Sequence, residues 1–290
     1  YEYQYAGPAG QALVGVEIRL PLMSCFIEYK FTLASYEAPL TQQEGWLAVT
    51  DLWRQLRRWL SGEAQVVTYP SSERGLRPFC RICGSVVPVV LPHMASAFIP
   101  AGNLEDDPGL RPALHMFAGS CASGFPITDP LPQYAAFPPE FDGGESVENP
   151  APRPRPGVTQ GSCLCGDIAW EFRGPPERVQ NCHCSRCRRA RSAAHATNAF
   201  FKREQLAWTR GEENLTSFAL PGAKRFGQDF CRRCGSPVPR VVASTGYVVV
   251  PCGSLDSPLE TRPRGHIFTG SKAPWYEITD GLPQWETLPA

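Results

Sequence analysis

The sequence lacks any uninterrupted run of about 18 apolar residues, the length that a membrane-spanning helix requires, so it predicts no segment that crosses a bilayer. No signal-peptide pattern is visible among the printed residues, which begin at Tyr1 rather than at a methionine. Net charge is also absent, because 28 lysines and arginines balance 28 aspartates and glutamates. A neutral chain gives little support to nonspecific attraction to nucleic acid.

The charge is nevertheless divided unevenly along the chain. Residues 1–150 carry 9 basic and 16 acidic side chains, a balance of −7, whereas residues 151–290 carry 19 and 12, a balance of +7. Two interpretations stay open: drift between two surfaces, or a second half that handles an anionic ligand.

Length and composition predict two domains that are mainly β. A chain of 290 residues is long enough for two cores, and its 30 prolines and 26 glycines favour many turns and short strands. Strand-like stretches cover residues 86–91, 167–172 and 246–251. One helix is expected at about residues 47–60, where Leu52, Leu56 and Leu60 recur at helical spacing.

Four blocks of sequence recur at a constant offset of 151 residues. Residues 79–88 match 230–239, 102–104 match 253–255, 115–120 match 266–271, and 127–133 match 278–284. One offset that serves four blocks predicts tandem copies, with domains at 1–140 and 157–290. A proline-rich linker at about residues 138–156 separates them.

The cysteines favour metal sites over disulfides. Nine of the twelve lie in tight clusters, as Cys-x-Cys or Cys-x-x-Cys pairs that make poor disulfide frameworks and good metal frameworks. Because thiolate ligands need a reducing environment, we expect a cytoplasmic protein.

Four cysteines of the second copy predict a closed zinc site. Cys163 and Cys165 face one side of an extended chain, and Cys231 and Cys234 form a zinc knuckle that ends in Gly235. Four thiolates make a tetrahedral site of the structural kind. Unpaired thiols or a disulfide are the alternatives.

Three further cysteines predict an open site. Cys182, Cys184 and Cys187 lie within six residues and have no obvious fourth partner, which is the pattern of catalytic zinc. Three thiolates leave the site electron-rich and suited to binding the thiolate of a ligand. His183 alternates with its neighbours, so we expect it to point away from the metal.

Basic side chains surround the open cluster. Arg186, Arg188, Arg189 and Arg191 are either a solvated face or a device that binds the carboxylates of a small thiol ligand. His195 is a lone histidine, a residue type that is more often structural than catalytic.

The second copy resembles a known family. Residues 161–166, 182–188, 230–236 and 271–275 carry GSCLCG, CHCSRCR, FCRRCGS and SKAPW. They are similar to the glutathione-dependent formaldehyde-activating enzymes, a family that includes the centromere protein V type domains. The order and spacing of seven cysteines carry this resemblance.

The resemblance implies a β-tent fold with two zinc ions in each complete domain. It implies a structural site of Cys163, Cys165, Cys231 and Cys234, and a catalytic site of Cys182, Cys184 and Cys187. The family's named activity is the addition of glutathione to formaldehyde, which gives S-hydroxymethylglutathione; the reverse reaction is that of a carbon–sulfur lyase.

The first copy departs from the family at its metal ligands. Ala12 and Val14 stand in the place of Cys163 and Cys165, while Cys25, Ile27 and Lys30 stand in the place of the open cluster. Cys80 and Cys83 keep the knuckle sequence, but the cysteine pair that would complete a four-thiolate site is replaced by Ala12 and Val14. We therefore expect about two zinc ions per chain, both in the second copy, and two copies that pack as an internal pseudo-dimer.

These observations predict a zinc-dependent carbon–sulfur lyase. Its partners would be glutathione or another small thiol and a small aldehyde, with Arg186, Arg188 and Arg189 holding the carboxylates of the thiol. The alternative is a non-catalytic zinc module that binds a protein or a nucleic acid. The arginine cluster lacks the interleaved aromatic residues that stack on bases, which makes nucleic acid the poorer partner.

Overall fold

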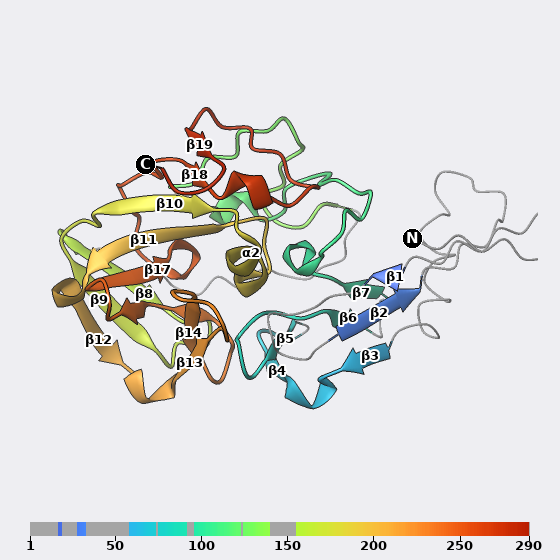
Figure 1. Cartoon of the computed structure of the whole chain (residues 1–290), viewed down its shortest axis with the longest axis horizontal. Coiled ribbons are helices and arrows are strands. Elements are labelled where there is room, and N and C mark those ends of the chain that lie inside the picture. Colours follow the sequence, from blue (N-terminus) through green and yellow to red (C-terminus); the bar gives the residue numbers. More distant parts are fainter. Residues whose placement is uncertain are drawn as a thin grey trace, which may run out of the picture.

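The computed structural model describes residues 17–18, 28–32, 58–73, 75–91, 96–122, 124–139 and 155–289. Across these residues the protein is mainly β, as the sequence predicts, with many short strands and one short α-helix (Figure 1). No helix in these described ranges has the length and hydropathy needed to cross a membrane.

The second half contains three sheets. The largest has six strands in the order β16-β17-β11-β10-β18-β19, and two three-stranded sheets have the orders β12-β9-β8 and β13-β14-β15. The strands are β8 (Val158–Ser162), β9 (Ala169–Arg173), β10 (Arg178–Cys182), β11 (Ala196–Lys202), β12 (Leu206–Arg210), β13 (Leu215–Ala219), β14 (Gly227–Cys231), β15 (Pro237–Val238), β16 (Arg240–Val242), β17 (Tyr247–Pro251), β18 (His266–Ile267) and β19 (Gln284–Trp285). Helix α2 (Ser185–Arg191) follows β10 directly.

The core of this half follows from alternating side chains. Buried and less buried residues alternate along β8, β9 and β17, which places one face of each strand inside. Phe172 of β9 stacks on Phe201 of β11 with ring centroids 4.1 Å apart, and Trp170 is 1% exposed. Gly161 is required beside Trp170, because a Cβ there would lie 2.6 Å from the indole ring.

The first half contains smaller sheets. Their orders are β1-β2-β3, β4-β5 and β6-β7. The strands are β1 (Glu17–Ile18), β2 (Glu28–Thr32), β3 (Arg58–Ser61), β4 (Val66–Pro70), β5 (Leu76–Cys80), β6 (Val89–Leu91) and β7 (Ser96–Phe98). Single-turn 3-10 helices are η1 (Glu63–Gln65), η3 (Ala101–Asn103) and η4 (Ala118–Ser120), and in the second half η5 (Arg203–Gln205), η6 (Glu212–Asn214), η7 (Cys252–Ser254) and η8 (Thr269–Ser271).

Several predictions for the first half lie outside the described residues. Residues 47–57 of the expected helix are among them, as are Ala12, Val14, Cys25 and Ile27. The end of that helix is wrong, because residues 58–60 belong to strand β3, which pairs with β2. Lys30 also differs from its expected counterpart: it lies inside β2, whereas Cys187 lies in α2. Most of the expected linker, residues 140–154, is not described.

Details of the two halves recur at the offset of 151 residues. His115 Nε2 lies 2.9 and 3.0 Å from the carboxylate oxygens of Asp129, and His266 makes the same pair of contacts with Asp280 at the same distances. Phe117 and Phe268 both adopt a left-handed backbone, with φ of 58° and 59°. Non-glycine residues rarely adopt this conformation, so its recurrence is informative.

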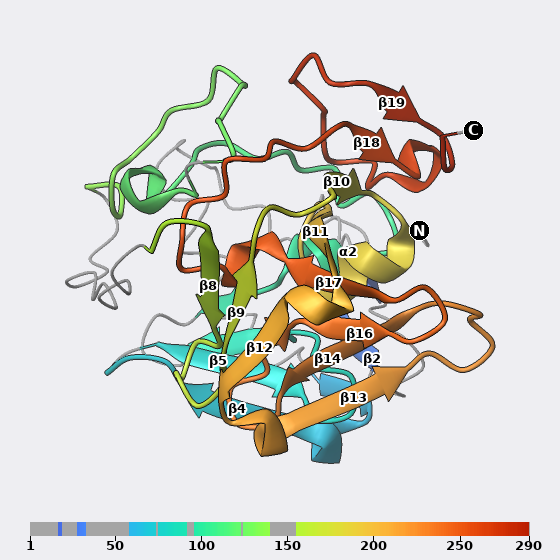
Figure 2. The ribbon, with the colours of Figure 1, turned by 90° about the vertical axis from the view of Figure 1, so that its left-hand side faces the viewer.

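The halves meet through matching contacts. A Cβ on Gly84 would lie 2.6 Å from the ring of Phe230, and a Cβ on Gly235 would lie 2.4 Å from the ring of Phe79. Each glycine is thus required by an aromatic ring of the other half. Figures 1 and 2 show the β4-β5 hairpin beside β13 and β14, where this contact is made.

Polar contacts between the halves follow the same pairing. Arg77 Nε donates to the Cys234 carbonyl at 3.1 Å, and Gln228 Nε2, 151 residues later, donates to the Cys83 carbonyl at 2.9 Å. One apolar cluster contains side chains from both halves. Its buried members are Phe79, Cys80, Cys83, Val87, Ala190, Phe218 and Phe230.

Candidate metal centre

The structure brings four of the predicted ligands together in the core of the second half. The sulfur atoms of Cys163, Cys165, Cys231 and Cys234 all lie within 4.8 Å of one another. Cys163 and Cys165 come from the turn between β8 and β9, while Cys231 ends β14 and begins the knuckle. Three of the four side chains are buried, so this cluster forms part of the hydrophobic core.

The spacing of these sulfurs suits a tetrahedral ion. Cys165 Sγ lies 3.4 Å from that of Cys163 and 3.7 Å from that of Cys231. A zinc ion with Zn–S bonds of about 2.3 Å needs its sulfurs about 3.8 Å apart. The backbone N–H of Ile168 also points at Cys163 Sγ, at 3.3 Å, and such a donor stabilises a thiolate. The residues therefore fit zinc.

The Cys-x-x-Cys-Gly sequence occurs in both halves of the chain, and the geometry of the knuckle turn explains why glycine follows the second cysteine. The Gly235 N–H donates to the Cys231 carbonyl at 2.9 Å, and the Gly84 N–H donates to the Cys80 carbonyl at 2.8 Å. Both glycines have φ near +70°, at 69° and 75°, where other residues are strained. The turn is thus kept in the first half, although its described residues contain no second cysteine pair to complete a site.

Hydrogen bonds link the thiols of the closed cluster. Hydrogen bonding, first with Cys231, raises the pKa of Cys163, while hydrogen bonding, first with Cys163, lowers the pKa of Cys234. A dication that binds all four sulfurs would displace the shared protons, so its affinity would rise with pH.

The open cluster also assembles as predicted. The sulfurs of Cys182, Cys184 and Cys187 lie within 4.8 Å of one another, and no other histidine, cysteine or acidic residue of the described chain joins them. Cys182 ends strand β10, Cys184 caps the N-terminus of α2, and Cys187 lies in its first turn. The Cys187 N–H points at Cys184 Sγ at 3.4 Å. A strand end followed by a helix start folds three nearby thiols onto one point.

The protons of this cluster are unevenly held. Hydrogen bonds from Cys182 and then Cys187 lower the pKa of Cys184 to about 2, whereas the pKa of Cys182 is raised to about 12, mainly by its bond to Cys184. One thiolate is therefore ready to bind a metal, and the other two thiols must lose protons. Cys182 and Cys184 are buried, and Cys187 is partly buried.

His183 is not a member of either sulfur cluster, in agreement with the prediction that its side chain points away from the metal. It is fully buried, and its Nε2 lies 2.8 Å from His266 Nδ1. His266 in turn contacts Asp280, which completes a chain from a carboxylate to the backbone of the cluster. Sequence reasoning did not identify His266 and Asp280, although the repeat at 151 residues marks both.

Two of the predicted ligand-binding arginines have other partners. Arg188 is 5% exposed and donates to the Leu104 carbonyl at 2.7 Å, and Arg189 forms an ion pair with Glu105. Both partners belong to the first half. The guanidinium carbon of Arg186 lies 6.0 Å from the ring centroid of Phe226.

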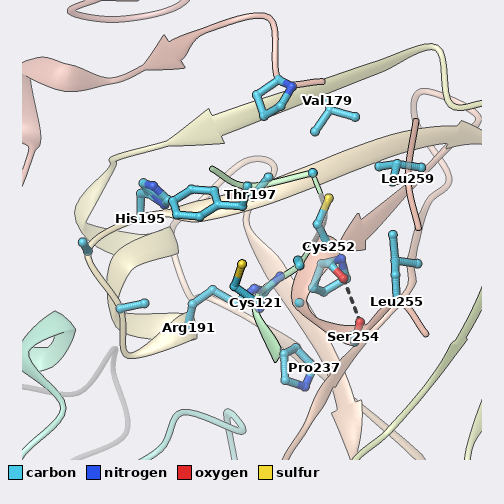
Figure 3. Close-up of a pocket in the computed structure, with 18 of the residues that line it drawn as sticks. Cys121, Val179, Arg191, His195, Thr197, Pro237, Cys252, Ser254, Leu255 and Leu259 are labelled. Carbon is cyan, nitrogen blue, oxygen red and sulfur yellow. Dashed lines mark hydrogen bonds between the residues drawn. The ribbon is translucent and has the colours of Figure 1, made fainter. Parts of the chain in front are cut away.

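Arg191 instead lines a large cleft that both halves enclose. The cleft has a volume of about 1100 Å³, and in Figure 3 Arg191, His195, Thr197 and Cys252 border it from the second half. Cys121 borders it from the first half. Arg191 Nη1 bonds to Gln228, while its buried Nε has no partner among the protein atoms. Burial lowers the pKa of this guanidinium, and the thiols of Cys187, Cys182 and Cys252 oppose that shift.

Two titratable side chains of the cleft are uncharged at neutral pH. Burial lowers the pKa of His195 to about 4, and burial raises the pKa of Cys252 to about 12, so at neutral pH both side chains are neutral. The ring of Phe125, from the first half, meets His195 edge-on at 5.7 Å. The cleft also contains Arg77, Asp129, Asp256 and Asp280, and among its two arginines Arg191 is the one whose charge acts on the thiols of the open cluster.

Comparison with known proteins supports the resemblance for the second half. Among solved structures, that of a Rhodobacter sphaeroides protein is 26% identical; the match covers 35% of this chain and 91% of that one, with a TM-score of 0.28. No curated protein matches the chain. Residues 158–271, which contain all seven clustered cysteines of the second half, match the model of the family described as glutathione-dependent formaldehyde-activating enzyme.

Proposed function

We propose that this protein is a zinc-dependent enzyme that forms or breaks a carbon–sulfur bond between a small thiol, such as glutathione, and a small aldehyde. The observation that carries the proposal is the pair of sulfur clusters: one closed by four cysteines and one left with three. A closed site stabilises a fold, and an open one can accept a ligand. The family match over residues 158–271 supports the same chemistry.

Cys182, Cys184 and Cys187 would hold the ion of the open site. Zinc in such a site supplies a position at which a substrate thiol is stabilised as its thiolate. The protein's own contribution is to hold the thiol and the aldehyde together, because correct placement removes much of the barrier to their addition. The cleft that Arg191 lines has a volume of about 1100 Å³, enough for both reactants; the three cysteines do not line it themselves, and Arg191 is the lining residue whose charge acts on them.

Arg191 is the residue that we assign to the carboxylates of the thiol substrate. Its Nε is buried without a partner, and its charge lies near Cys187. A carboxylate would satisfy that donor in a charge-assisted hydrogen bond. The Nε atoms of Arg188 and Arg189 are also buried without a partner, but neither residue lines the cleft and their terminal nitrogens bind Leu104 and Glu105, so Arg191 replaces both in this assignment. Arg186 retains its predicted role in this proposal.

We also propose that the halves are tandem copies that pack as an internal pseudo-dimer, with about two zinc ions bound by the second half. The matched pairs Phe79–Gly235 and Phe230–Gly84 support this pairing. A reducing compartment such as the cytoplasm would keep the seven thiols available.

The test compares turnover of the intact protein with that of Cys187→Ser. The rate of glutathione addition to formaldehyde is measured by exchange NMR, because the uncatalysed reaction also proceeds. We expect the variant to retain one zinc ion, fold normally and lose catalysis. Arg191→Lys should raise KM for glutathione more than it lowers kcat, because a lysine keeps the charge without the fixed geometry of the guanidinium.

The alternative of a nucleic-acid-binding module is tested with the same samples. A steep loss of binding to an oligonucleotide with rising salt, together with no catalysis of glutathione addition, would support that alternative. If Cys187→Ser unfolds the protein as fully as loss of Cys231 does, the second cluster is structural and the enzyme proposal fails.

A further inference from the structure

We infer that the first half positions the open thiol site, because it seats helix α2 through Gly102, Leu104 and Glu105. The inference concerns how the three thiols are held; it rests on the proposed metal site but not on the reaction. Helix α2 carries Cys187 in its first turn, and its last turn reaches the other half of the molecule (Figure 1). Ala190 of this helix packs in the apolar cluster that contains Phe79 and Val87.

Arg188 ties the helix to the end of η3. Its Nη1 donates to the Leu104 carbonyl at 2.7 Å and lies 3.4 Å from the Gly102 carbonyl. The side chain is 5% exposed, so these carbonyls supply polar partners for the buried Nη1, whereas Nε has no partner among the protein atoms. Without the first half this charge would lose them. Arg189 adds an ion pair with Glu105 at the rim of the same contact.

The end of the helix touches the first half at backbone level. A Cβ on Gly102 would lie 2.1 Å from the Ala193 nitrogen and 2.4 Å from the Ser192 carbonyl carbon. No side chain larger than hydrogen fits there without moving η3 away from α2. The Ser192 hydroxyl also donates to the Val86 carbonyl at 3.0 Å.

These contacts fix one end of a short helix, and the cysteines fix the other. Cys182 and Cys184 belong to the strand end and the cap, whereas Cys187 is placed by the helix itself. A helix of seven residues is unstable in isolation, so its orientation depends on what it packs against. Gly102, Leu104 and Glu105 are therefore positioning residues for Cys187, although they lie in the metal-poor half.

The experiment uses the full chain and the variants Gly102→Ala and Gly281→Ala. Gly281 is the control glycine, because a Cβ there meets no described atom within 4 Å. Hydrogen exchange of the α2 amides is measured, and zinc affinity is measured by competition with a chromophoric chelator. We expect Gly102→Ala to speed exchange in α2 at least tenfold and to weaken one of the two zinc ions at least tenfold. The other zinc ion and the control should be unchanged.

A second, milder pair covers the case in which Gly102→Ala does not fold. Glu105→Gln removes the ion pair with Arg189, and Asp106→Asn makes the same charge change at the next residue, which is exposed. We expect a two- to threefold increase in α2 exchange for Glu105→Gln alone. Unchanged exchange in folded Gly102→Ala and in Glu105→Gln, or equal weakening of both zinc ions, would overturn the inference. If the wild type binds zinc only at the closed site, the proposed function fails while the exchange measurement still decides the positioning role.

Discussion

The two halves keep the same supports but differ in their thiols. Both have a Cys-x-x-Cys-Gly turn, a His–Asp pair with the same distances, and a left-handed phenylalanine. The second half adds five clustered cysteines that the described part of the first half lacks. Features present with and without the metal ligands must serve folding or packing. The comparison therefore separates the scaffold from the residues that we assign to metal chemistry.

The largest expected effect would come from the knuckle cysteines. Cys231→Ala should destabilise the protein by several kcal/mol, because structural zinc contributes about 10–16 kcal/mol to folding. Cys80→Ala, its counterpart 151 residues earlier, should cost only about 1–2 kcal/mol as an ordinary buried substitution. Thermal melting and zinc content are measured on both. Equal losses would mean that the first half also holds a metal.

The next test concerns the contact that the halves share. Phe79→Ala and Phe230→Ala should each cost about 3–5 kcal/mol, because each ring is fully buried against a glycine of the other half. Urea unfolding measures both. Phe98→Ala is the control, since that ring is 44% exposed and its loss should have little effect. A large cost for one buried ring and a small cost for the other would break the symmetry of the contact.

A smaller effect is expected for the loss of folding stability in acid that His195, a residue of the second half, causes. The pKa of His195 falls from 6.5 to about 4 in the folded protein, mainly because of burial. Between these values the unfolded chain binds the extra proton, so stability is lost as the pH falls from about 6.5 to about 4. His195→Gln should reduce that loss by at most about 3 kcal/mol. Melting curves of the wild type and of His195→Gln are measured from pH 7 to 4. Any loss of zinc in acid affects both proteins, so it cancels when their stabilities are subtracted. Identical pH profiles would contradict a lowered pKa of His195 as the cause of this acid sensitivity.

The smallest expected effect concerns a hydrogen bond between two residues that match at the offset of 151. The hydroxyls of Thr128 and Thr279 lie 2.5 Å apart at an exposed position. Thr128→Val should cost about 0.5–1.5 kcal/mol, the net contribution of one hydrogen bond. Thr279→Val should cost the same, and the double variant should cost no more than either one. Additive costs in that cycle would show that the two hydroxyls do not interact.

Each cysteine pair could be predicted because its geometry is local: Cys-x-Cys and Cys-x-x-Cys spacings bring neighbouring sulfurs together, and both clusters assemble as expected. The joining of Cys163 and Cys165 with Cys231 and Cys234 is not local, and the family resemblance implied it. The direction of His183 follows from the same alternation. The repeat at 151 residues similarly anticipates the matched turns and the His–Asp pairs.

The roles of the arginines could not be predicted because they depend on the other half. Nothing in the sequence near Arg188 indicates that it binds the carbonyl of Leu104, which lies 84 residues earlier in the chain. A solvated or ligand-binding face was therefore the natural expectation. The helix predicted at residues 47–60 failed at its end for a similar reason. Leu60 continues the helical spacing, yet the chain there pairs with β2 as a strand. Tertiary pairing overrides local periodicity.

Phe79 and Phe230 each pack against a glycine of the other half, and this contact does not depend on the concentration of the protein. Two separate chains would have to find each other to make this contact, and their pairing would weaken as concentration falls. A covalent connection instead supplies an effective concentration in the millimolar range, whatever the amount of protein in solution. The partner of each half is always present, so a cell could keep very few copies of this protein without separating Gly84 from Phe230 or α2 from η3.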